Sequence, residues 1–134
     1  MGCDIHLHSE IKINGSWEHY SVIKVNRDYM LFGLMAGVRD SKVTPICKPQ
    51  GLPDNLSVVT KLDYERMKGD AHSMSYYNSI LIYELEKAIE ENREFLPNIK
   101  FGYLFGNGYG GFDKYRQDYP KEIEDIRFVF WFDN

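Results

Sequence analysis

The sequence predicts an α+β fold, in which an antiparallel or mixed sheet has helices packed mainly on one face. Residues 3–13 alternate apolar and polar side chains, and Asn14-Gly15 separates them from a second strand-like run, which is typical of a β-hairpin. Residues 126–133 form a short aromatic and apolar run, which indicates a central strand buried on both faces. About residues 76–93 carry apolar side chains at helical spacing, which predicts a long amphipathic helix.

The opening strand separates its side chains into two chemically different faces, because successive residues of a strand point to opposite sides. Asn14 and Gly15 both tolerate positive φ, so a tight turn follows and residues 17–25 return as the second strand. One face of the first strand holds Ile5, Leu7, Ile11 and Ile13, and the other holds Asp4, His6, His8, Glu10 and Lys12.

Two further helices are expected on either side of an irregular segment. Residues 29–37 are apolar nearly all round, which predicts a buried helix that ends at Gly37. The prolines and glycine of residues 38–56 indicate an irregular surface segment. Ser57 is a suitable N-cap for a helix that runs through Met67 and closes at Gly69, because its side-chain oxygen can accept a bond from a free amide of the first turn.

A polar connector, residues 70–75, precedes the long helix. Ser73 or Ser75 can cap that helix, and Pro97 ends it.

The last part of the chain is expected to add two strands. Residues 99–105 predict a strand, and residues 106–111 predict a flexible loop rich in glycine. The final strand at residues 126–133 needs pairing partners along its edges, since an unpaired apolar edge promotes aggregation. Its natural partner is another core strand, for which the opening strand is one candidate.

Size and composition fit a single domain, residues 1–134, in a reducing compartment. The chain is 43% hydrophobic, which is enough for an ordinary core. Cys3 and Cys47 form neither a CxxC pair nor a disulfide framework, so a cytoplasmic location is expected. No apolar run reaches the roughly 20 residues of a membrane span, and we expect no membrane partner. The net charge of −4 argues against a long nucleic acid as partner but leaves a small anionic ligand open.

The polar face of the first strand is the first candidate site. Side chains on one face of a strand repeat at about 6.6–6.8 Å, so His6 and His8 could converge on one ligand with Asp4 beside them. Imidazole and carboxylate groups also suit a divalent metal, with distant help from His72. The favoured alternative is a solvated outer face of the hairpin, because antiparallel sheets commonly expose one face to water.

The second candidate site is the connector before the long helix. His72 precedes the predicted helix N-terminus, whose free amides and positive dipole attract phosphate, and Ser73 and Ser75 add hydroxyl donors. Ordinary capping explains the two serines equally well, but it leaves His72 and Asp70 without a role.

Three weaker signals complete the candidate sites. Residues 106–111 match GxGxxG but lack a strand–loop–helix context, so a dinucleotide site is not expected. A mobile lid in which Tyr109 stacks on a base is a better interpretation, and a plain loop is the favoured one. Arg39 could hold a phosphate through its planar fork. Arg127 lies in the buried run and should be paired, with Asp4, Asp125 or Asp133 as the candidates.

The chain resembles a family of small phage and prophage proteins without an assigned function. The resemblance lies at both ends and in the middle of the chain, and it gives no catalytic residues. Its motifs are MGCDIH at residues 1–6, LF at 31–32, AGVR at 36–39, GLPD at 51–54, His72-Ser73 with Ser75, and VFWFDN at 129–134. It implies a phage setting, hence the bacterial host cytoplasm, where small accessory proteins often counter host defence by binding or cleaving nucleotide signals.

The leading hypothesis is therefore an anti-defence protein that binds and sequesters a small phosphorylated nucleotide. One alternative is a phosphodiesterase or nuclease, in which His6, His8 and His72 are catalytic and a divalent metal, if any, is held by Asp4, His6 and His8. A second alternative is a protein–protein inhibitor of a host enzyme. No cofactor is certain, and a homo-oligomer remains open. The expected ligand-binding residues are Asp4, His6, His8, Arg39, His72, Ser73, Ser75 and Tyr109.

Overall fold

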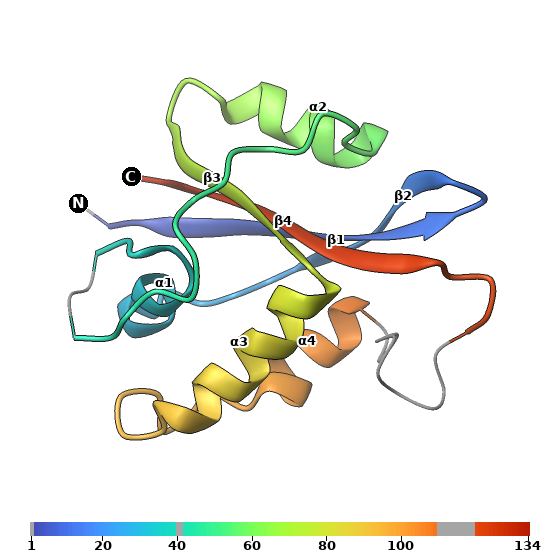
Figure 1. Ribbon diagram of the computed structural model, residues 1–134. Coiled ribbons are helices and arrows are strands. Elements are labelled where there is room, and N and C mark those ends of the chain that lie inside the picture. Colours follow the sequence, from blue (N-terminus) through green and yellow to red (C-terminus); the bar gives the residue numbers. More distant parts are fainter. Residues whose placement is uncertain (1, 40–41, 110–119) are drawn as a thin grey trace.

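A four-stranded antiparallel sheet with the strand order β2-β1-β4-β3 lies at the centre of the fold (Figure 1). The computed structural model describes residues 2–39, 42–109 and 120–134, and the side chains of residues 107–109 lie outside this description. The strands are β1 (Asp4–Ile13), β2 (Ser16–Ile23), β3 (Ala71–Asn78) and β4 (Asp125–Asp133). Together with the helices described below, this sheet confirms the predicted α+β fold.

The β1–β2 hairpin is confirmed. Asn14 and Gly15 adopt φ values of 51° and 78°, the left-handed conformation that the tight turn requires. Ile13 pairs with Ser16, and the strands stay in register until an irregularity between Ser9 and Glu10.

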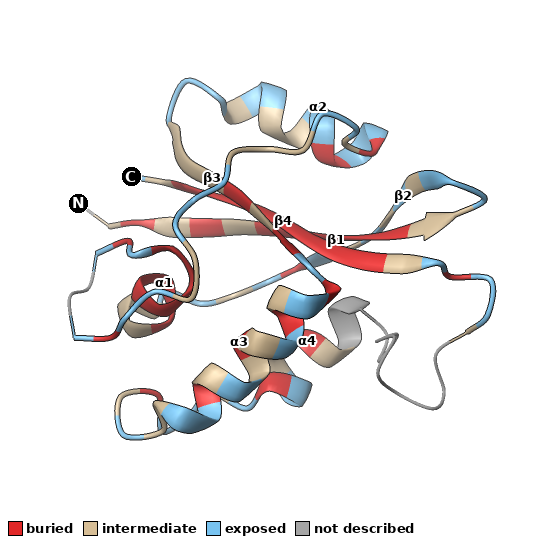
Figure 2. Ribbon diagram, viewed as in Figure 1, coloured by how far each residue is buried: buried red, intermediate tan, exposed pale blue. Residues whose placement is uncertain are grey.

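The last strand is central, as predicted. β4 pairs with β1 along one edge, from Asp4 opposite Asp133 to Lys12 opposite Asp125, and with β3 along its other edge. Residues 126–132 are all buried (Figure 2). Pairing on both edges satisfies the backbone polar groups of a strand that water cannot reach.

The helices divide unequally between the two faces of the sheet, which confirms the predicted arrangement. On one face lie α1 (Tyr29–Ala36), α3 (Ser79–Glu91) and α4 (Phe101–Tyr109), and on the other lies α2 (Val58–Met67) (Figure 1). The face with three helices holds most of the apolar core; there Phe32 of α1 packs edge-on against Phe132, with ring centroids 5.2 Å apart. None of the described helices is both long enough and apolar enough to cross a membrane.

The two helices nearest the hairpin in sequence begin where expected. Asp28 caps α1 by accepting bonds from two backbone amides, and Gly37 ends this helix with φ 71°. α2 begins after Ser57, but the Ser57 side chain makes no cap bond, because its hydroxyl binds Glu10 instead. α2 runs through Met67 as predicted, but it does not end on a left-handed glycine, because its C-cap is Lys68 in a right-handed conformation and Gly69 has no positive φ.

The predicted connector at residues 70–75 is wrong, because most of this segment belongs to strand β3. The second edge of the buried strand β4 needs a partner, and β3 supplies it, with Ser75 opposite Phe130 and Tyr77 opposite Phe128. α3 accordingly begins at Ser79, and Asn78 caps it by accepting a bond from Leu81 N.

The predicted strand at residues 99–105 is also wrong. Phe101 and Phe105 lie one helical turn apart in α4, and both are buried. The ring of Phe105 stacks on Phe128 with centroids 5.5 Å apart, so one helix face covers the sheet. Of the expected glycine loop, residues 106–109 belong to α4 and residues 110–111 lie outside the described residues.

A buried ion pair joins the sheet to the segment that leads into α2. Arg127 Nε donates to Glu10 Oε1 at 2.7 Å, and its other nitrogens donate to Asn55 Oδ1 at 2.9 Å and to Asn55 O at 3.0 Å. Glu10 also accepts from the amide and hydroxyl of Ser57. Burial raises the pKa of the Glu10 carboxyl, but the bonds from Ser57 and Thr60 and the nearby Arg127 outweigh it, so the net pKa is lowered.

This arrangement corrects two expectations about the polar face of β1. Arg127 is paired as predicted, but its partner is Glu10, directly opposite in the β1–β4 register, and not Asp4, Asp125 or Asp133. The favoured interpretation of a solvated outer face is wrong for His8 and Glu10, which are 1% and 0% exposed. α2 and the segment before it cover them.

We predict that Arg127→Leu lowers the free energy of unfolding by about 3–5 kcal/mol, because it leaves the buried Glu10 carboxylate without its counter-ion. Urea denaturation at pH 7 measures the loss. The matched control is Arg27→Leu, which removes an arginine from the exposed ion pair with Asp4 and should cost far less. Equal losses for the two variants would contradict the structural role of the buried pair.

Candidate functional site

A cleft between α2 and the hairpin brings titratable and apolar side chains together. Its volume is ≈ 560 Å³. A neighbouring depression of ≈ 370 Å³ continues it along β1 and the end of β2. We call the first of these the α2 cleft; its lining residues are His6, His8, Val22, Val59, Leu62, Asp63, Arg66 and Met67.

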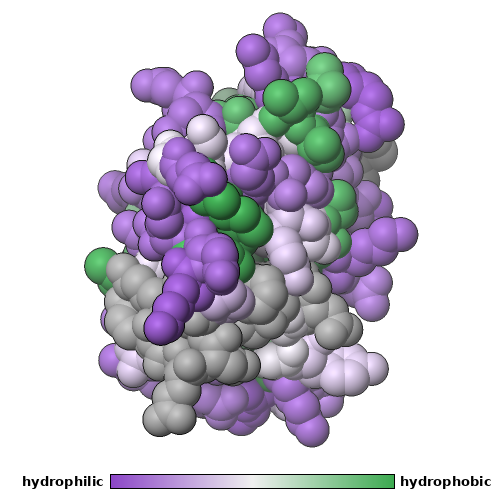
Figure 3. Space-filling view, turned by 90° about the vertical axis from the view of Figure 1, so that its right-hand side faces the viewer, coloured by the Kyte–Doolittle hydropathy of each residue, from purple (hydrophilic) through white to green (hydrophobic). Residues whose placement is uncertain are grey.

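The apolar walls of the α2 cleft come from two elements. Val59 and Leu62 of α2 are 49% and 64% exposed, and Val22 of β2 is 52% exposed. In the side view, hydrophobic residues gather near the top of the molecule, where α2 lies, among hydrophilic ones (Figure 3). Exposed aliphatic side chains beside polar groups are typical of a small-molecule site.

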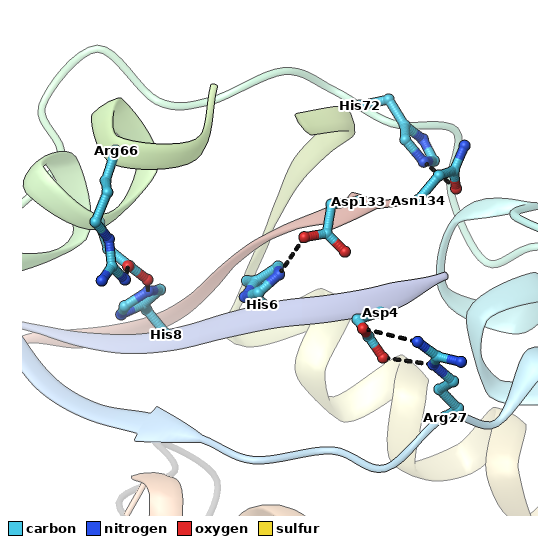
Figure 4. Close-up of polar contacts among 9 residues, drawn as sticks. Asp4, His6, His8, Arg27, Arg66, His72, Asp133 and Asn134 are labelled. Carbon is cyan, nitrogen blue, oxygen red and sulfur yellow. Dashed lines mark hydrogen bonds and ion pairs between the residues drawn. The ribbon is translucent and has the colours of Figure 1, made fainter. Parts of the chain in front are cut away.

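His8 is the most constrained group of the site, because both of its ring nitrogens are hydrogen-bonded. Nε2 lies 2.7 Å from Asp63 Oδ2 on α2, and Nδ1 lies 2.9 Å from His19 Nε2 on β2. Arg66 bonds the same Asp63 carboxylate, and Figure 4 shows His8 directed toward this part of α2. Burial lowers the pKa of His8 below its usual range, although the bond to Asp63 works in the opposite direction.

The partners of His8 also have shifted pKa values. Burial raises the pKa of Asp63, but its bonds with His8 and Arg66 outweigh this, so the net pKa of the carboxyl is lowered. Burial and the neighbouring His8 both lower the pKa of His19. At neutral pH the three groups linked by these hydrogen bonds are therefore an ionised Asp63 carboxylate and the uncharged imidazoles of His8 and His19.

His6 lies on the same face, one step along β1 from His8. Its Nε2 is 3.1 Å from Asp133 Oδ2 (Figure 4). Its ring stacks on Trp131 with centroids 6.0 Å apart. Trp131 also stacks on His8 at 5.3 Å and meets the edge of Tyr64 from α2. Trp131 thus fixes the two imidazoles side by side.

Asp4, His6 and His8 do not converge on one point. Asp4 instead accepts two hydrogen bonds from Arg27, at 2.7 and 3.1 Å, and this pairing lowers the pKa of its carboxyl (Figure 4). Within the described part of the chain, no three His, Cys, Asp or Glu side chains are grouped so that they could hold a metal ion. Each of the three residues proposed as metal ligands is hydrogen-bonded to a different partner: Asp4 to Arg27, His6 to Asp133, and His8 to Asp63.

His72 lies on the opposite face of the sheet from His6. In the strand register His72 is opposite Phe132, whereas His6 is opposite Trp131, and adjacent residues of β4 point to opposite faces. The ring of His72 stacks on Phe132 and its Nε2 lies 3.1 Å from Asn134 Oδ1. The expectation that both histidine segments face one pocket is therefore wrong.

The other residues expected around the phosphate are dispersed. The anion site at a helix N-terminus is wrong, because Ser73 and Ser75 lie within β3 and α3 begins only at Ser79. Ser75 is buried, and its hydroxyl accepts a bond from Gln50 N.

Arg39 does not line the α2 cleft. Arg39 is exposed, with its guanidinium 5.4 Å from the ring centroid of Tyr29. Tyr109 ends α4, and its side chain lies outside the described residues.

Three site residues were missed from the sequence: His19, Asp63 and Arg66. His19 could have been found, because the tight turn at Asn14-Gly15 sets a register in which His19 is opposite Glu10, on the same face as His8. Asp63 and Arg66 are separated by one helical turn, which predicts an ion pair on one face of α2. Nothing in the sequence indicates that this face turns toward β1.

Comparison of the chain with protein-family models, curated proteins and solved structures found no match. The chemistry of the site is therefore argued from its own geometry. That geometry can hold a small molecule between aliphatic walls, with guanidinium donors of Arg66 at one side and the hydrogen-bonded imidazole of His8 beside them.

We predict that the free energy of unfolding falls as the pH decreases from 7.5 to 5. His8 and His19 have lowered pKa values in the folded state, so below about pH 6.5 the unfolded chain binds more protons than the folded one. Each such proton contributes a slope of up to about 1.4 kcal/mol per pH unit.

The measurement is urea denaturation of the wild type and of His8→Asn at several pH values in this range. The variant lacks His8, one of the two imidazoles whose pKa is lowered by folding, so its free energy of unfolding should depend less steeply on pH. A slope identical to that of the wild type would show that His8 does not titrate in this way.

Proposed function

We propose that the protein binds and sequesters a small phosphorylated nucleotide in the α2 cleft. The observation that supports this most directly is that Arg66 lines the same cavity as the aliphatic side chains of Val59 and Leu62. Such a cavity offers hydrogen-bond donors for an anionic group next to an apolar surface for a planar base. A phosphorylated nucleotide combines these two parts in one small molecule.

Arg66 suits the phosphate end of this ligand. Its side chain is 75% exposed, and of its guanidinium nitrogens one bonds Asp63, which leaves further donors directed to solvent. A planar guanidinium can bind two phosphate oxygens at once. The ion pair with Asp63 already restricts the Arg66 side chain at the cleft, so Arg66 loses less conformational entropy when a ligand binds.

The size and walls of the cleft suit the rest of the ligand. Its volume of ≈ 560 Å³ lies within the roughly 300–1,000 Å³ of typical ligand sites. Val22, Val59 and Leu62 would lose exposed apolar surface against a base, which favours binding through the hydrophobic effect. The acidic net charge of −4 suits a small ligand better than a long polyanion.

The phage setting that the resemblance implies suggests a biological role for this binding. In the cytoplasm of an infected bacterium, a protein that captures a nucleotide signal made by the host would weaken the defence that the signal controls. Capture alone suffices for this role, provided that the protein is abundant relative to the signal.

Binding fits the geometry better than turnover in the α2 cleft. Both ring nitrogens of His8 are already hydrogen-bonded, so His8 cannot exchange a proton with a ligand unless one of these bonds breaks. His72, proposed as the general acid of a phosphodiesterase, lies on the other face of the sheet. In a hydrolase acting in this cleft, His6 would be the one lining histidine left to act as general acid or base.

A second candidate function is inhibition of a host enzyme through the outer surface of α2. Val58 and Leu62 are 72% and 64% exposed, and Val59 lies between them in sequence. Aliphatic side chains exposed on one short helix are a common feature of protein-binding surfaces.

We predict that the purified protein retains an intact nucleotide. It is incubated with a panel of mononucleotides and cyclic dinucleotides, freed of unbound ligand by gel filtration and then denatured by heat. Intact nucleotide in the supernatant supports capture, and a cleavage product would instead support a phosphodiesterase. Absence of both retention and cleavage contradicts nucleotide binding and favours the inhibitor.

We predict that Arg66→Gln weakens retention of the captured nucleotide by about ten- to hundredfold in Kd, since a charged hydrogen bond to phosphate is lost. Isothermal titration calorimetry measures the change. Lys87→Gln is the matched control, because it removes one positive charge from the exposed side of α3, on the other face of the sheet. Equal affinities of the two variants would contradict the placement of the phosphate.

A further inference from the structure

The hydrogen bonds of Asp63, His8 and His19 form one continuous chain from α2 through β1 to β2. Asp63 Oδ2 and His8 Nε2 are 2.7 Å apart, and His8 Nδ1 and His19 Nε2 are 2.9 Å apart. His8 is 1% exposed, so water does not compete for these contacts. The positions of the protons in such a chain follow from which groups can donate.

The carboxylate at one end determines the tautomers of both imidazoles. An ionised carboxylate only accepts hydrogen bonds, so the proton between Asp63 and His8 belongs to His8 Nε2. A neutral imidazole has a single N–H, which makes His8 Nδ1 an acceptor and requires His19 Nε2 to donate. His19 Nδ1 is then left with a lone pair, and it makes no hydrogen bond to any residue that the structure describes.

His19 lines a cavity distinct from the α2 cleft. This hairpin cavity has a volume of ≈ 430 Å³ and lies between the turn end of β2 and the start of α2. Its lining residues are Ser16, Trp17, Glu18, His19, Leu56, Ser57, Val58 and Val59. Among the described residues, Val59 lines both cavities, and the hydrogen-bond chain from Asp63 through His8 to His19 runs between them.

The side chains that face the hairpin cavity are uncharged. Glu18 also borders it, but Glu18 is opposite Ile11 in the register, so its side chain points to the other face of the sheet from Trp17 and His19. Among the residues that the structure describes, the lining holds neither a lysine nor an arginine. Trp17, Leu56 and Val58 give the cavity apolar walls, which suit the uncharged part of a ligand. A neutral molecule with a hydroxyl group, or a water molecule beside it, therefore fits this cavity better than a phosphate.

We propose that His19 Nδ1 is the hydrogen-bond acceptor for the hydroxyl group of a neutral compound, or for a water molecule, held in the hairpin cavity. The hydroxyl donates to the Nδ1 lone pair and keeps its proton, so the imidazole stays uncharged and still donates from Nε2 to His8. His8 and Asp63 are positioning residues, since they fix the ring and tautomer of His19 without touching the ligand. The proposal does not rest on nucleotide binding in the α2 cleft.

The decisive test is nitrogen NMR of the histidine rings in the full chain at neutral pH. We expect His8 and His19 both to carry their proton on Nε2, with a through-hydrogen-bond coupling between His8 Nδ1 and His19 Nε2. Correlation of each ring with the backbone of its own residue assigns the four histidines in the wild type. A wild-type His19 protonated on Nδ1, or the absence of the coupling, would overturn the proposal without any need for a variant to fold.

Asp63→Asn tests the direction of the chain. An amide can donate to His8 Nε2, which would move the proton of both rings to Nδ1 and remove the free lone pair of His19. We expect carbethoxylation of His19 by diethyl pyrocarbonate, mapped by mass spectrometry, to be at least about tenfold slower in this variant.

Asp70→Asn is the matched control, because it makes the same change at an exposed aspartate just after α2. It should leave the tautomers and the carbethoxylation rate of His19 as in the wild type. A folded Asp63→Asn protein with unchanged tautomers and unchanged His19 reactivity would refute the assigned role of the carboxylate.

Discussion

The arrangement of this protein depends on one buried carboxylate. Glu10 lies in the middle of β1 with no exposed surface, and its charge is balanced by Arg127 of β4 and by hydrogen bonds from Ser57 at the start of α2. A buried charge is tolerated only when such partners are present. Because those partners come from β4 and from the segment before α2, satisfying Glu10 also places α2 over this face of the sheet.

The position of α2 creates both cavities and the contact between them. Without α2, the polar face of β1 would be a hydrated surface with separate histidines. With α2 in place, Asp63 meets His8, the aliphatic residues of the helix form a wall of the α2 cleft, and its first residues close one side of the hairpin cavity. Burial of His8 also removes water from the chain that leads to His19, which strengthens each hydrogen bond in it.

Two cavities of different chemistry thus share one small scaffold. The α2 cleft has the Arg66 guanidinium beside aliphatic residues, which suits an anionic group, whereas the hairpin cavity has apolar side chains and an uncharged imidazole, which suits a neutral one. Asp63 belongs to both arrangements, since it holds Arg66 with one oxygen and His8 with the other. Protonation or substitution of Asp63 would therefore alter the hydrogen bonds of Arg66 in the α2 cleft and of the chain that leads to His19.

The sequence alone determined the parts of the fold that depend on local chemistry. The turn at Asn14-Gly15, the buried helix that ends at Gly37 and the central strand of residues 126–133 follow from allowed φ values and from side-chain periodicity, which need no knowledge of distant neighbours. The tertiary structure decided the rest. Residues 71–78 became a strand because β4 needed a partner on its second edge, and residues 101–109 became a helix whose Phe105 covers Phe128. It also separated His72 from His6 and joined His8 to Asp63, because strand register and the burial of Glu10, rather than spacing along the chain, determine which side chains meet.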